Sequence, residues 1–443
     1  MASTYLSRTF SASPTSTKII TFSVWFKRSG LGEQHIFGNR ATDNYRSHLY
    51  FDSSDRFSLL GKRPDGTGNN SINITTNRRF RDTNGWYHLV VAIDTSLATA
   101  ADRVKIYVNG VLETSFAQET NPNQNDVLQL NKDLAHEIGS YDGSNYYFDG
   151  YMSHIHFIDG TQYAASAFGE TDSNGVWKIK TSPSVTYGNH GFFILKDGNS
   201  VTDQSPNSNN WAVTAGTLTN DKDNPSNVFA IFNSLHNYYE GGTYAYGNNQ
   251  ITTGGSNKYT WNNSTIGMEA GKYYAEFKWV SGGTDILFGL TDKYTSSSTG
   301  ELGNYDKQYA YRTNGTVRNN NGNLSGWSGS TWTTGDVVGV AYDATNGKLY
   351  FSKNGTWQNS GDPTSGSTGT GAISVSASPQ DGCYYFSSCG YDDASCVLQA
   401  NFGNGRFGTT AVSSAGTNAS NNGVFEYDVP TGYTALCTKG LNL

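Results

Sequence analysis

The stretch SYDGSNYYFDG, residues 140–150, concentrates side chains that suit the recognition of a sugar. A sugar offers a weakly apolar ring face, which stacks on aromatic rings, and hydroxyl groups, which pair with amides and carboxylates. The stretch supplies both kinds of group, so we interpret it as a candidate binding loop; the alternative is a hairpin with framework aromatics. The candidate ligand-binding residues here are Tyr141, Asn145, Tyr146 and Tyr147.

Catalytic motifs do not support an enzyme. The sequence lacks the Gly-x-Ser-x-Gly turn of hydrolases and the phosphate loop Gly-x4-Gly-Lys-Ser/Thr, and HEIGS at His136 is not the His-Glu-x-x-His of a zinc protease. A Glu-x-Asp-x-x-Glu arrangement for glycoside hydrolysis is absent as well. His154 and His156 would share one face of a strand, either as half of a metal site or, more commonly, as a solvated or interface pair. We therefore expect no catalysis, and keep a polysaccharide-degrading enzyme only as an alternative.

β-structure must position these residues. Alternating apolar and polar residues, with Gly- and Asn-rich turns and no long helical period, predict an all-β chain. Residues 92–113 and 342–357 nearly repeat each other: an apolar strand ends in an aspartate, and an alternating strand closes on Asn-Gly. Asn109–Gly110 suits a tight two-residue turn, because both positions need positive φ. Two antiparallel sandwiches with similar hairpins would produce this repetition.

The chain of 443 residues is too long for one ordinary domain. Strand signals fall into two blocks, separated by a more polar segment. We predict two antiparallel β-sandwiches joined by an ordered connector, which packs against one or both of them, and a C-terminal strap across the second sandwich. The predicted ranges are 1–160 for the first sandwich, 161–237 for the connector, 238–410 for the second sandwich and 411–443 for the strap.

Charge and targeting signals limit the partners and the location that we expect for this protein. The formal net charge is -7 and no basic stripe is present, which disfavours nucleic acid and anionic lipid as partners. No apolar run approaches the roughly 20 residues of a membrane span, and the first residues lack the apolar core of a signal peptide. The aromatic, glycine-rich composition nevertheless looks extracellular, and a virion component made in the host cytoplasm would reconcile the two. The four cysteines are expected to be reduced and buried.

The first block resembles a concanavalin A-like jelly roll of the laminin G-like group over nearly all of residues 5–160. In that family one motif reads Gly-x-Ile-Asp-Glu-Val; here Ser153 and His154 replace the two acids, which argues against a metal role of that strand. Related folds use loop carboxylates for calcium, so the resemblance makes Asp142 and Asp149 the candidate calcium ligands, and no other cofactor is expected. The stretches that carry the resemblance are FSVWFKRS (22–29), IFGNR (36–40), WYHLVVAID (86–94), KIYVNGVLE (105–113) and IGSYDGSNYYFDGYMSHIHFIDG (138–160).

The second block resembles a SPRY domain, a bent β-sandwich that binds partners and has no known catalysis. Such domains usually bind through loops, which makes YAYRTNG (309–315) and NNSTIGM (262–268) the candidate binding segments. The candidate ligand-binding residues in this block are Tyr309, Tyr311 and Asn314. The stretches that carry the resemblance are GKYYAEFKW (271–279), LFGLTD (287–292), GDVVGVAYDATNGKLYFSKNG (335–355) and ANFGNGRFG (400–408).

The whole arrangement resembles tail-fibre-like virion proteins of marine bacteriophages. Those proteins join the same two modules through a connector similar to residues 187–211 and 223–233, and often end like VPTGYTALCTK (429–439). The resemblance implies a non-enzymatic adhesin of a phage tail or fibre that binds bacterial cell-surface polysaccharide for host attachment. The alternative is a structural adaptor that decorates a capsid or joins tail parts. Expected partners are the polysaccharide, other virion tail or capsid proteins and further copies of the chain, without nucleic acid or membrane insertion.

Overall fold

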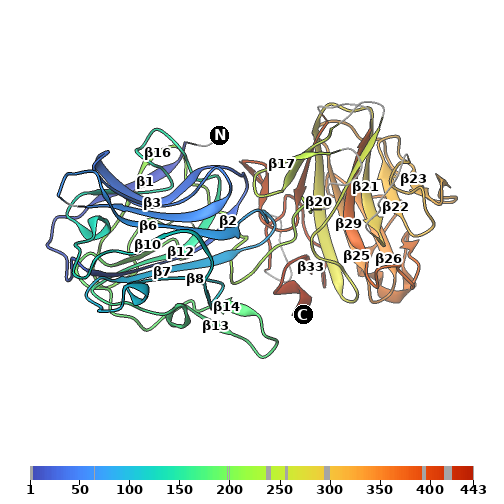
Figure 1. Cartoon of the computed structure of the whole chain (residues 1–443). Helices are drawn as coiled ribbons and strands as arrows, with labels where there is room; N and C mark the ends of the chain where they lie inside the picture. Colours follow the sequence, from blue (N-terminus) through green and yellow to red (C-terminus); the bar gives the residue numbers. More distant parts are fainter. Residues whose placement is uncertain are drawn as a thin grey trace. The chain divides into compact units, whose positions relative to one another are not determined.

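The computed structural model describes residues 3–63, 65–196, 198, 200–235, 241–254, 258–293, 300–391, 396–413 and 422–442. The chain divides into two compact units, residues 1–220 and 221–443 (Figure 1). Antiparallel sheets dominate both units, which confirms the predicted all-β class with two sandwiches. Within these described ranges, the helical segments are short 3-10 turns and none is long and apolar enough to cross a membrane.

The first unit is built from two large sheets and a small hairpin. The eight-stranded sheet has the order β10 (Phe116–Thr120), β6 (Asn70–Arg79), β5 (Arg56–Lys62), β4 (Tyr45–Phe51), β3 (Gln34–Thr42), β11 (Ala135–Ile138), β1 (Tyr5–Thr9), β16 (Ala212–Ala215). The six-stranded sheet has the order β15 (Phe192–Ile194), β12 (Gly150–Asp159), β2 (Ile19–Arg28), β7 (Tyr87–Asp94), β8 (Val104–Val108), β9 (Val111–Leu112). The remaining elements are the β13 (Gly169–Thr171) and β14 (Trp177–Ile179) pair, η1 (Ala100–Asp102), η2 (Gln129–Asn131) and η3 (Ala165–Ala167).

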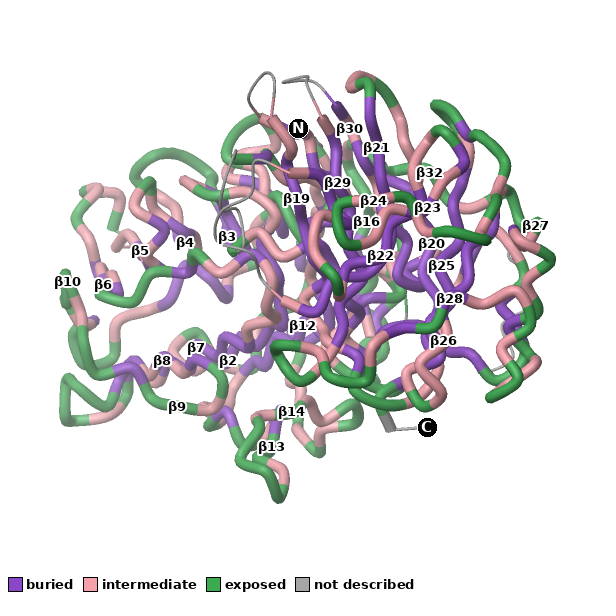
Figure 2. The backbone as a smooth tube through the Cα atoms, turned by 90° about the vertical axis from the view of Figure 1, so that its right-hand side faces the viewer, coloured by how far each residue is buried: buried purple, intermediate pink, exposed green. Residues whose placement is uncertain are grey.

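Alternation along the strands decides which side chains form the core of the first unit. Phe22 of β2 and Phe37 of β3 stack across the two sheets, with ring centroids 4.8 Å apart. Leu49 of β4 belongs to the same buried cluster. Figure 2 colours the backbone by burial, and buried stretches, in purple, run along β2 and β7. Because successive side chains of a strand point to opposite faces, His48 and Tyr50 of β4 lie on the outer face of the eight-stranded sheet. This outer face later carries the candidate site.

The segment predicted as a connector, residues 161–237, is divided between the two units. Its first part completes the first unit: β15 pairs with β12, and β16 pairs with β1. Phe168 packs on the outer face of the six-stranded sheet in a buried cluster with Val90, and Trp177 Nε1 donates to His88 Nδ1 at 3.0 Å. Residues from 221 onward belong to the second unit. The predicted boundary at 237–238 lies outside the described residues.

The second unit contains a nine-stranded and a six-stranded sheet. The first has the order β17 (Thr243–Ala245), β18 (Gln250–Thr252), β30 (Val397–Asn401), β20 (Lys272–Ser281), β25 (Val337–Asp343), β26 (Lys348–Lys353), β27 (Thr356–Trp357), with β28 (Ile373–Ser374) on β26 and β33 (Thr434–Ala435) parallel to β20. The second has the order β19 (Tyr259–Asn263), β29 (Tyr385–Tyr391), β21 (Asp285–Thr291), β22 (Tyr309–Arg312), β23 (Val317–Asn319), β24 (Gly322–Asn323). The remaining elements are β31 (Arg406–Phe407), β32 (Thr410–Ala411), η4 (Pro363–Thr368) and η5 (Gly440–Asn442).

The repeated sequence phrase corresponds to one hairpin in each unit, as predicted. β7 pairs with β8 in the first unit and β25 pairs with β26 in the second. The Asn-Gly pair then turns β8 into β9 and β26 into β27. Asn109–Gly110 has φ values of 48° and 81°, and Asn354–Gly355 has 47° and 79°, which are the positive values that a tight two-residue turn needs. Asp94 and Asp343 accept hydrogen bonds from residues of the turns that follow them.

A buried glutamate fastens the C-terminal segment to the second unit. Glu276 of β20 is fully buried, and its carboxylate accepts the backbone N–H groups of Glu426 at 2.8 Å and Tyr427 at 2.9 Å. Asn401 Nδ2 and the Tyr274 hydroxyl donate to the same carboxylate, each at 3.2 Å. Residues 422–442 therefore run across the outer face of β20, in the manner of a strap. All four cysteines are free thiols, and three of them are buried.

Candidate functional site

The candidate binding loop lies against the outer face of the eight-stranded sheet. We call residues 139–150 the Tyr141 loop. His35 N–H donates to the Tyr146 carbonyl at 2.9 Å, and Gly139 N–H donates to the Ile36 carbonyl at 3.0 Å, so β3 holds the loop at two points. Within the loop, Tyr141 N–H donates to the Asn145 carbonyl at 3.1 Å. The backbone of the loop is therefore fixed by a strand rather than left free in solvent.

Tyr141 is the centre of an aromatic cluster between the loop and the sheet. Its ring centroid lies 4.7 Å from that of His48 and 4.9 Å from that of His35. The His35 ring in turn stacks on Tyr50 at 4.9 Å. Tyr146 meets Tyr141 edge-on at 6.0 Å. The cluster joins two strands that are adjacent in the sheet to a loop that is about 100 residues away in sequence.

Two arginines of the β3–β4 hairpin complete the site. The guanidinium carbons of Arg40 and Arg46 lie 5.2 Å and 5.7 Å from the Tyr141 ring centroid, within range of cation–π attraction. Arg46 also donates to the Tyr141 hydroxyl. Arg40 pairs with Asp142 of the loop at 3.3 Å, and both arginines pair with Asp43 in the hairpin turn. The site thus holds two positive and two negative groups around one tyrosine.

The two histidines beneath Tyr141 are neutral. His35 and His48 are 3% and 2% exposed, and burial, reinforced by the nearby charge of Arg46, lowers the pKa of His35 to about 3 and that of His48 to about 2. No ring nitrogen of either histidine finds a hydrogen-bond partner among the described residues, and Glu33 Oε1 lies 3.6 Å from His35 Nε2. Buried polar groups without partners are rare in folded proteins and cost about 1–3 kcal/mol each.

Tyr146 presents its ring to solvent. Its side chain ranks among the exposed large hydrophobic ones, at 48%, and its φ of 52° lies in the left-handed region that non-glycine residues seldom adopt. Asn145 beside it is exposed. Tyr147 is half-buried: its hydroxyl donates to the Gly143 carbonyl at 2.8 Å, and its ring lies 6.4 Å from that of Tyr5. The structure therefore gathers Tyr141, Asn145 and Tyr146, and gives Tyr147 a supporting position.

The residues around Asp142 do not fit a calcium ion. One oxygen of Asp142 already accepts from Ser144 N–H and Oγ and from Asn145 Nδ2, and the other pairs with Arg40. Burial opposes ionisation of this carboxyl, but these donors outweigh it and its pKa is lowered. Asp149 lies beside Gly30 in the β2–β3 loop and not beside Arg40. Calcium needs six to eight oxygen ligands, and no group of three or more His, Cys, Asp or Glu residues in the described ranges is arranged to hold a metal.

Tyr309 and Tyr311, two of the candidate ligand-binding residues, do not lie at the surface. They are 6% and 0% exposed and belong to the core of the second unit. The Tyr309 hydroxyl accepts from Ser376 N–H at 3.2 Å, and the Tyr311 hydroxyl donates to the Ser330 carbonyl. The physical reason is the place of β22 inside a sheet, where alternate residues share the inner face. Asn314 is exposed, but its side-chain oxygen accepts two hydrogen bonds from Thr316 within the turn.

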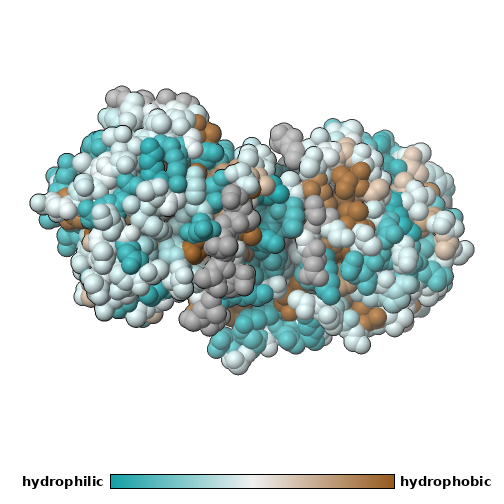
Figure 3. All heavy atoms as spheres, turned by 180° about the vertical axis from the view of Figure 1, so that it is seen from behind, coloured by the Kyte–Doolittle hydropathy of each residue, from teal (hydrophilic) through white to brown (hydrophobic). Residues whose placement is uncertain are grey.

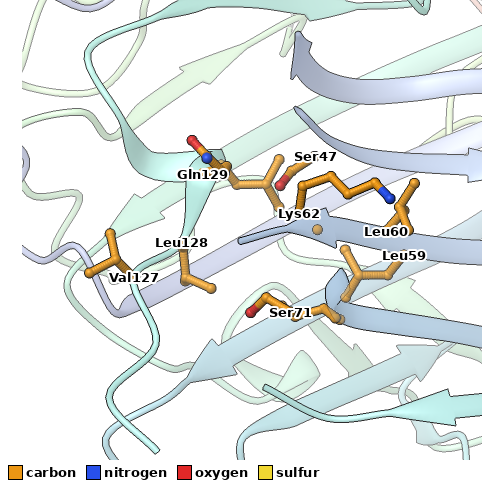
Figure 4. Close-up of a pocket in the computed structure, with 11 residues that line it drawn as sticks. Ser47, Leu59, Leu60, Lys62, Ser71, Val127, Leu128 and Gln129 are labelled. Carbon is orange, nitrogen blue, oxygen red and sulfur yellow. The ribbon is translucent and has the colours of Figure 1, made fainter. Parts of the chain in front are cut away.

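Two further features carry no separate site. His154 and His156 are buried under the segment after β12, where His156 stacks on Phe193 at 3.9 Å. A pocket between β4, β5 and residues 127–130 holds only about 10 Å³, close to the minimum for one water molecule (Figure 4). The face of the molecule seen in Figure 3 is largely hydrophilic, with small separate hydrophobic patches.

Sequence comparison identifies two modules. The concanavalin A-like lectin/glucanases superfamily profile matches residues 3–165, and the SPRY domain profile matches residues 272–383. Among the curated proteins, none matches significantly. The ranges agree with the two sandwich units described above.

Solved structures resemble parts of the chain at low identity. The SPRY domain of human HERC1 is 16% identical, with 34% of this chain and 87% of that chain covered and a TM-score of 0.28. A protein from Bacteroides ovatus described as carbohydrate binding is 15% identical (50% and 60% covered, TM-score 0.32). A heptameric SAP-like pentraxin from Limulus polyphemus is 16% identical (35% and 69% covered, TM-score 0.24). By its sequence profiles, the chain carries a concanavalin A-like, laminin G-like domain followed by a SPRY domain.

Proposed function

We propose that this protein is a non-enzymatic adhesin of a phage tail or fibre, which binds bacterial surface polysaccharide through the Tyr141 loop. The observation that most directly supports this function is the position of Tyr146. Its ring is exposed on a loop that the sheet holds in a strained conformation. Strained backbone persists where the surrounding structure enforces it and is frequent at ligand sites. Fixed aromatic side chains lose little conformational entropy on binding, which suits them to a preformed site.

The domain composition supports binding as the activity. The first unit belongs to a superfamily whose description includes lectins. Its Tyr141 loop supplies an exposed ring with amide and carboxylate groups, and the adjacent β3–β4 hairpin supplies the guanidinium groups. The virion setting rests on the resemblance of residues 187–211, 223–233 and 429–439 to tail-fibre-like proteins. Weak single sites would gain avidity from several copies on one particle.

Binding of the labelled full chain to candidate host cells tests this function. We expect saturable binding that blocks phage adsorption, and a loss of affinity of about 10-fold or more for Tyr146→Ala, the scale of a binding hot spot. Tyr246→Ala is the matched control, because Tyr246 is 44% exposed and also has a positive φ, of 53°, but lies in the second unit.

Three outcomes would contradict parts of the proposal. Equal loss of binding in Tyr146→Ala and Tyr246→Ala would show that the Tyr141 loop is not the binding site. Absence of binding, together with burial of the protein among other virion components, would favour the structural adaptor. Release of reducing sugar from the host envelope would contradict the non-enzymatic role.

A further inference from the structure

We propose that the Tyr141 loop selects sugars that carry a carboxylate, with Arg40 and Arg46 as the groups that bind it. The inference rests on the proposed sugar-binding function and adds the chemical class of the ligand. Both guanidinium groups meet at one carboxylate oxygen, Asp43 Oδ1, at 3.1 Å from Arg40 and 3.3 Å from Arg46. The geometry of a two-arginine carboxylate site is therefore already present at the surface.

Asp43 occupies the position that a ligand carboxylate would take. Its side chain is 72% exposed and lies in the β3–β4 turn, away from the core. Ion pairs with exposed carboxylates contribute only about 0–1 kcal/mol, so displacing this one costs little. Arginine presents its N–H donors in a planar arrangement that matches a carboxylate, which favours a carboxylate over a hydroxyl group in the same place.

Tyr141 holds the two arginines for this role. It accepts a hydrogen bond from Arg46, and its ring lies within 6 Å of both guanidinium groups. Asp142 holds Arg40 from the loop side at 3.3 Å. Tyr141 is itself enclosed by His48, His35 and the arginines, so it acts as a positioning residue and Tyr146 remains the ring on which a sugar can stack.

Unpartnered polar atoms gather at the base of this site. Arg46 Nε is buried and has no hydrogen-bond partner in the part of the chain that the structure describes, and the same holds for both ring nitrogens of His35 and of His48. Five such atoms in one cluster are unusual, because nearly all buried polar groups in proteins are paired. These atoms lie under Tyr141 and are closed to a surface ligand, so the ligand contacts of the site are those of Arg40, Arg46 and Tyr146.

The charge of the whole chain does not oppose the assignment. The net charge of -7 repels anions at long range, but salt screens such repulsion over about 8 Å under physiological conditions. Within that distance, the ligand meets two guanidinium groups, which both pair with the exposed Asp43, while Arg40 also pairs with the less exposed Asp142. We therefore expect affinity for acidic sugars to fall as salt concentration rises.

A glycan array tests the inference with the full chain. Polygalacturonate, alginate and polysialic acid are printed beside their carboxyl-reduced forms. We expect at least about 10-fold preference for the acidic forms, lost in Arg40→Gln and Arg46→Gln, since a hydrogen bond to a charged group contributes about 1.5–3 kcal/mol. Asp43→Asn should raise acidic-sugar affinity about 3- to 10-fold, because it removes the competing carboxylate.

Controls separate recognition from folding. Arg79→Gln changes an exposed arginine outside the site and should leave the preference intact. Arg46→Lys keeps the charge but loses the planar donor set, so reduced preference with unchanged melting temperature would support the geometric argument. Equal binding of acidic and reduced forms, unaffected by the arginine variants, would overturn the inference and leave sugar binding standing. Binding to neither form would overturn both.

Discussion

Replacement of Glu276 by glutamine tests how the C-terminal strap is held. The wild-type carboxylate is fully buried and accepts four hydrogen bonds, from Tyr274, Asn401 and the backbone N–H groups of Glu426 and Tyr427. Glutamine keeps one oxygen, but its NH2 group faces two of these donors. At about 1–3 kcal/mol for each buried donor left unpaired, the strap should lose about 2–6 kcal/mol of stability.

The same substitution predicts a pH dependence. Burial raises the pKa of Glu276 from its ordinary value of 4.5 to about 7, so the folded protein keeps this proton at pH values where the unfolded chain has lost it. The stabilisation linked to this group is therefore full below about pH 4.5 and declines as the pH rises through 7. At roughly 1.4 kcal/mol per pH unit, the decline amounts to about 3 kcal/mol. Glutamine does not ionise, so the difference in strap stability between the wild-type protein and the variant should become smaller from pH 5 to pH 7.5.

Hydrogen exchange of peptides from residues 422–437, corrected for the intrinsic effect of pH on exchange, measures the opening of the strap. Glu269→Gln is the matched control, because Glu269 is exposed and lies just before the same strand. Unchanged protection in Glu276→Gln would refute the role of Glu276 in holding the strap. If the difference in protection between wild type and variant is the same at pH 5 and pH 7.5, the raised pKa of Glu276 is refuted.

Further predictions concern the first unit, the buried Tyr311 and the candidate site. Arg28→Met should lower the melting temperature of the first unit, with a loss of about 3–5 kcal/mol, because it removes a fully buried guanidinium that pairs with Asp55; calorimetry measures this. Tyr311→Phe should cost about 1 kcal/mol in urea unfolding and leave glycan affinity unchanged, whereas altered affinity would restore Tyr311 as a ligand contact. Glycan affinity should stay constant from pH 5 to pH 8, because His35 and His48 remain neutral there; a change centred near pH 6.5 would contradict their lowered pKa values. Calorimetric titration with millimolar calcium should give no heat, because donors already surround Asp142.

Local patterns were sufficient to predict the elements of the fold. Alternation along strands and the Asn-Gly turns depend on neighbouring residues alone, and the all-β class and both hairpins are confirmed. The polar segment after residue 160 was harder to interpret. Its strands are only three or four residues long and obtain their stability by pairing with β12 and β1, which are distant in sequence. A short strand has too few residues to show a pattern of its own.

The candidate site shows the same division. The sequence identified the Tyr141 loop, because its residue types suit a sugar, and alternation implies that His48 and Tyr50 share a face of β4. Alternation also implies that Tyr309 and Tyr311 share a face of β22, but it does not show that this face points into the core. Which face of a strand meets the other sheet depends on register and pairing across the whole unit.

The sequence by itself determined the strand-forming character, the two hairpins and the modules to which the chain is similar, since each depends on short-range order. Only the tertiary structure brought Arg40 and Arg46 to Tyr141, and only it buried Tyr311 in the second unit. Contacts between residues about 100 positions apart depend on sheet order and loop anchoring, which are set by the packing of all strands together.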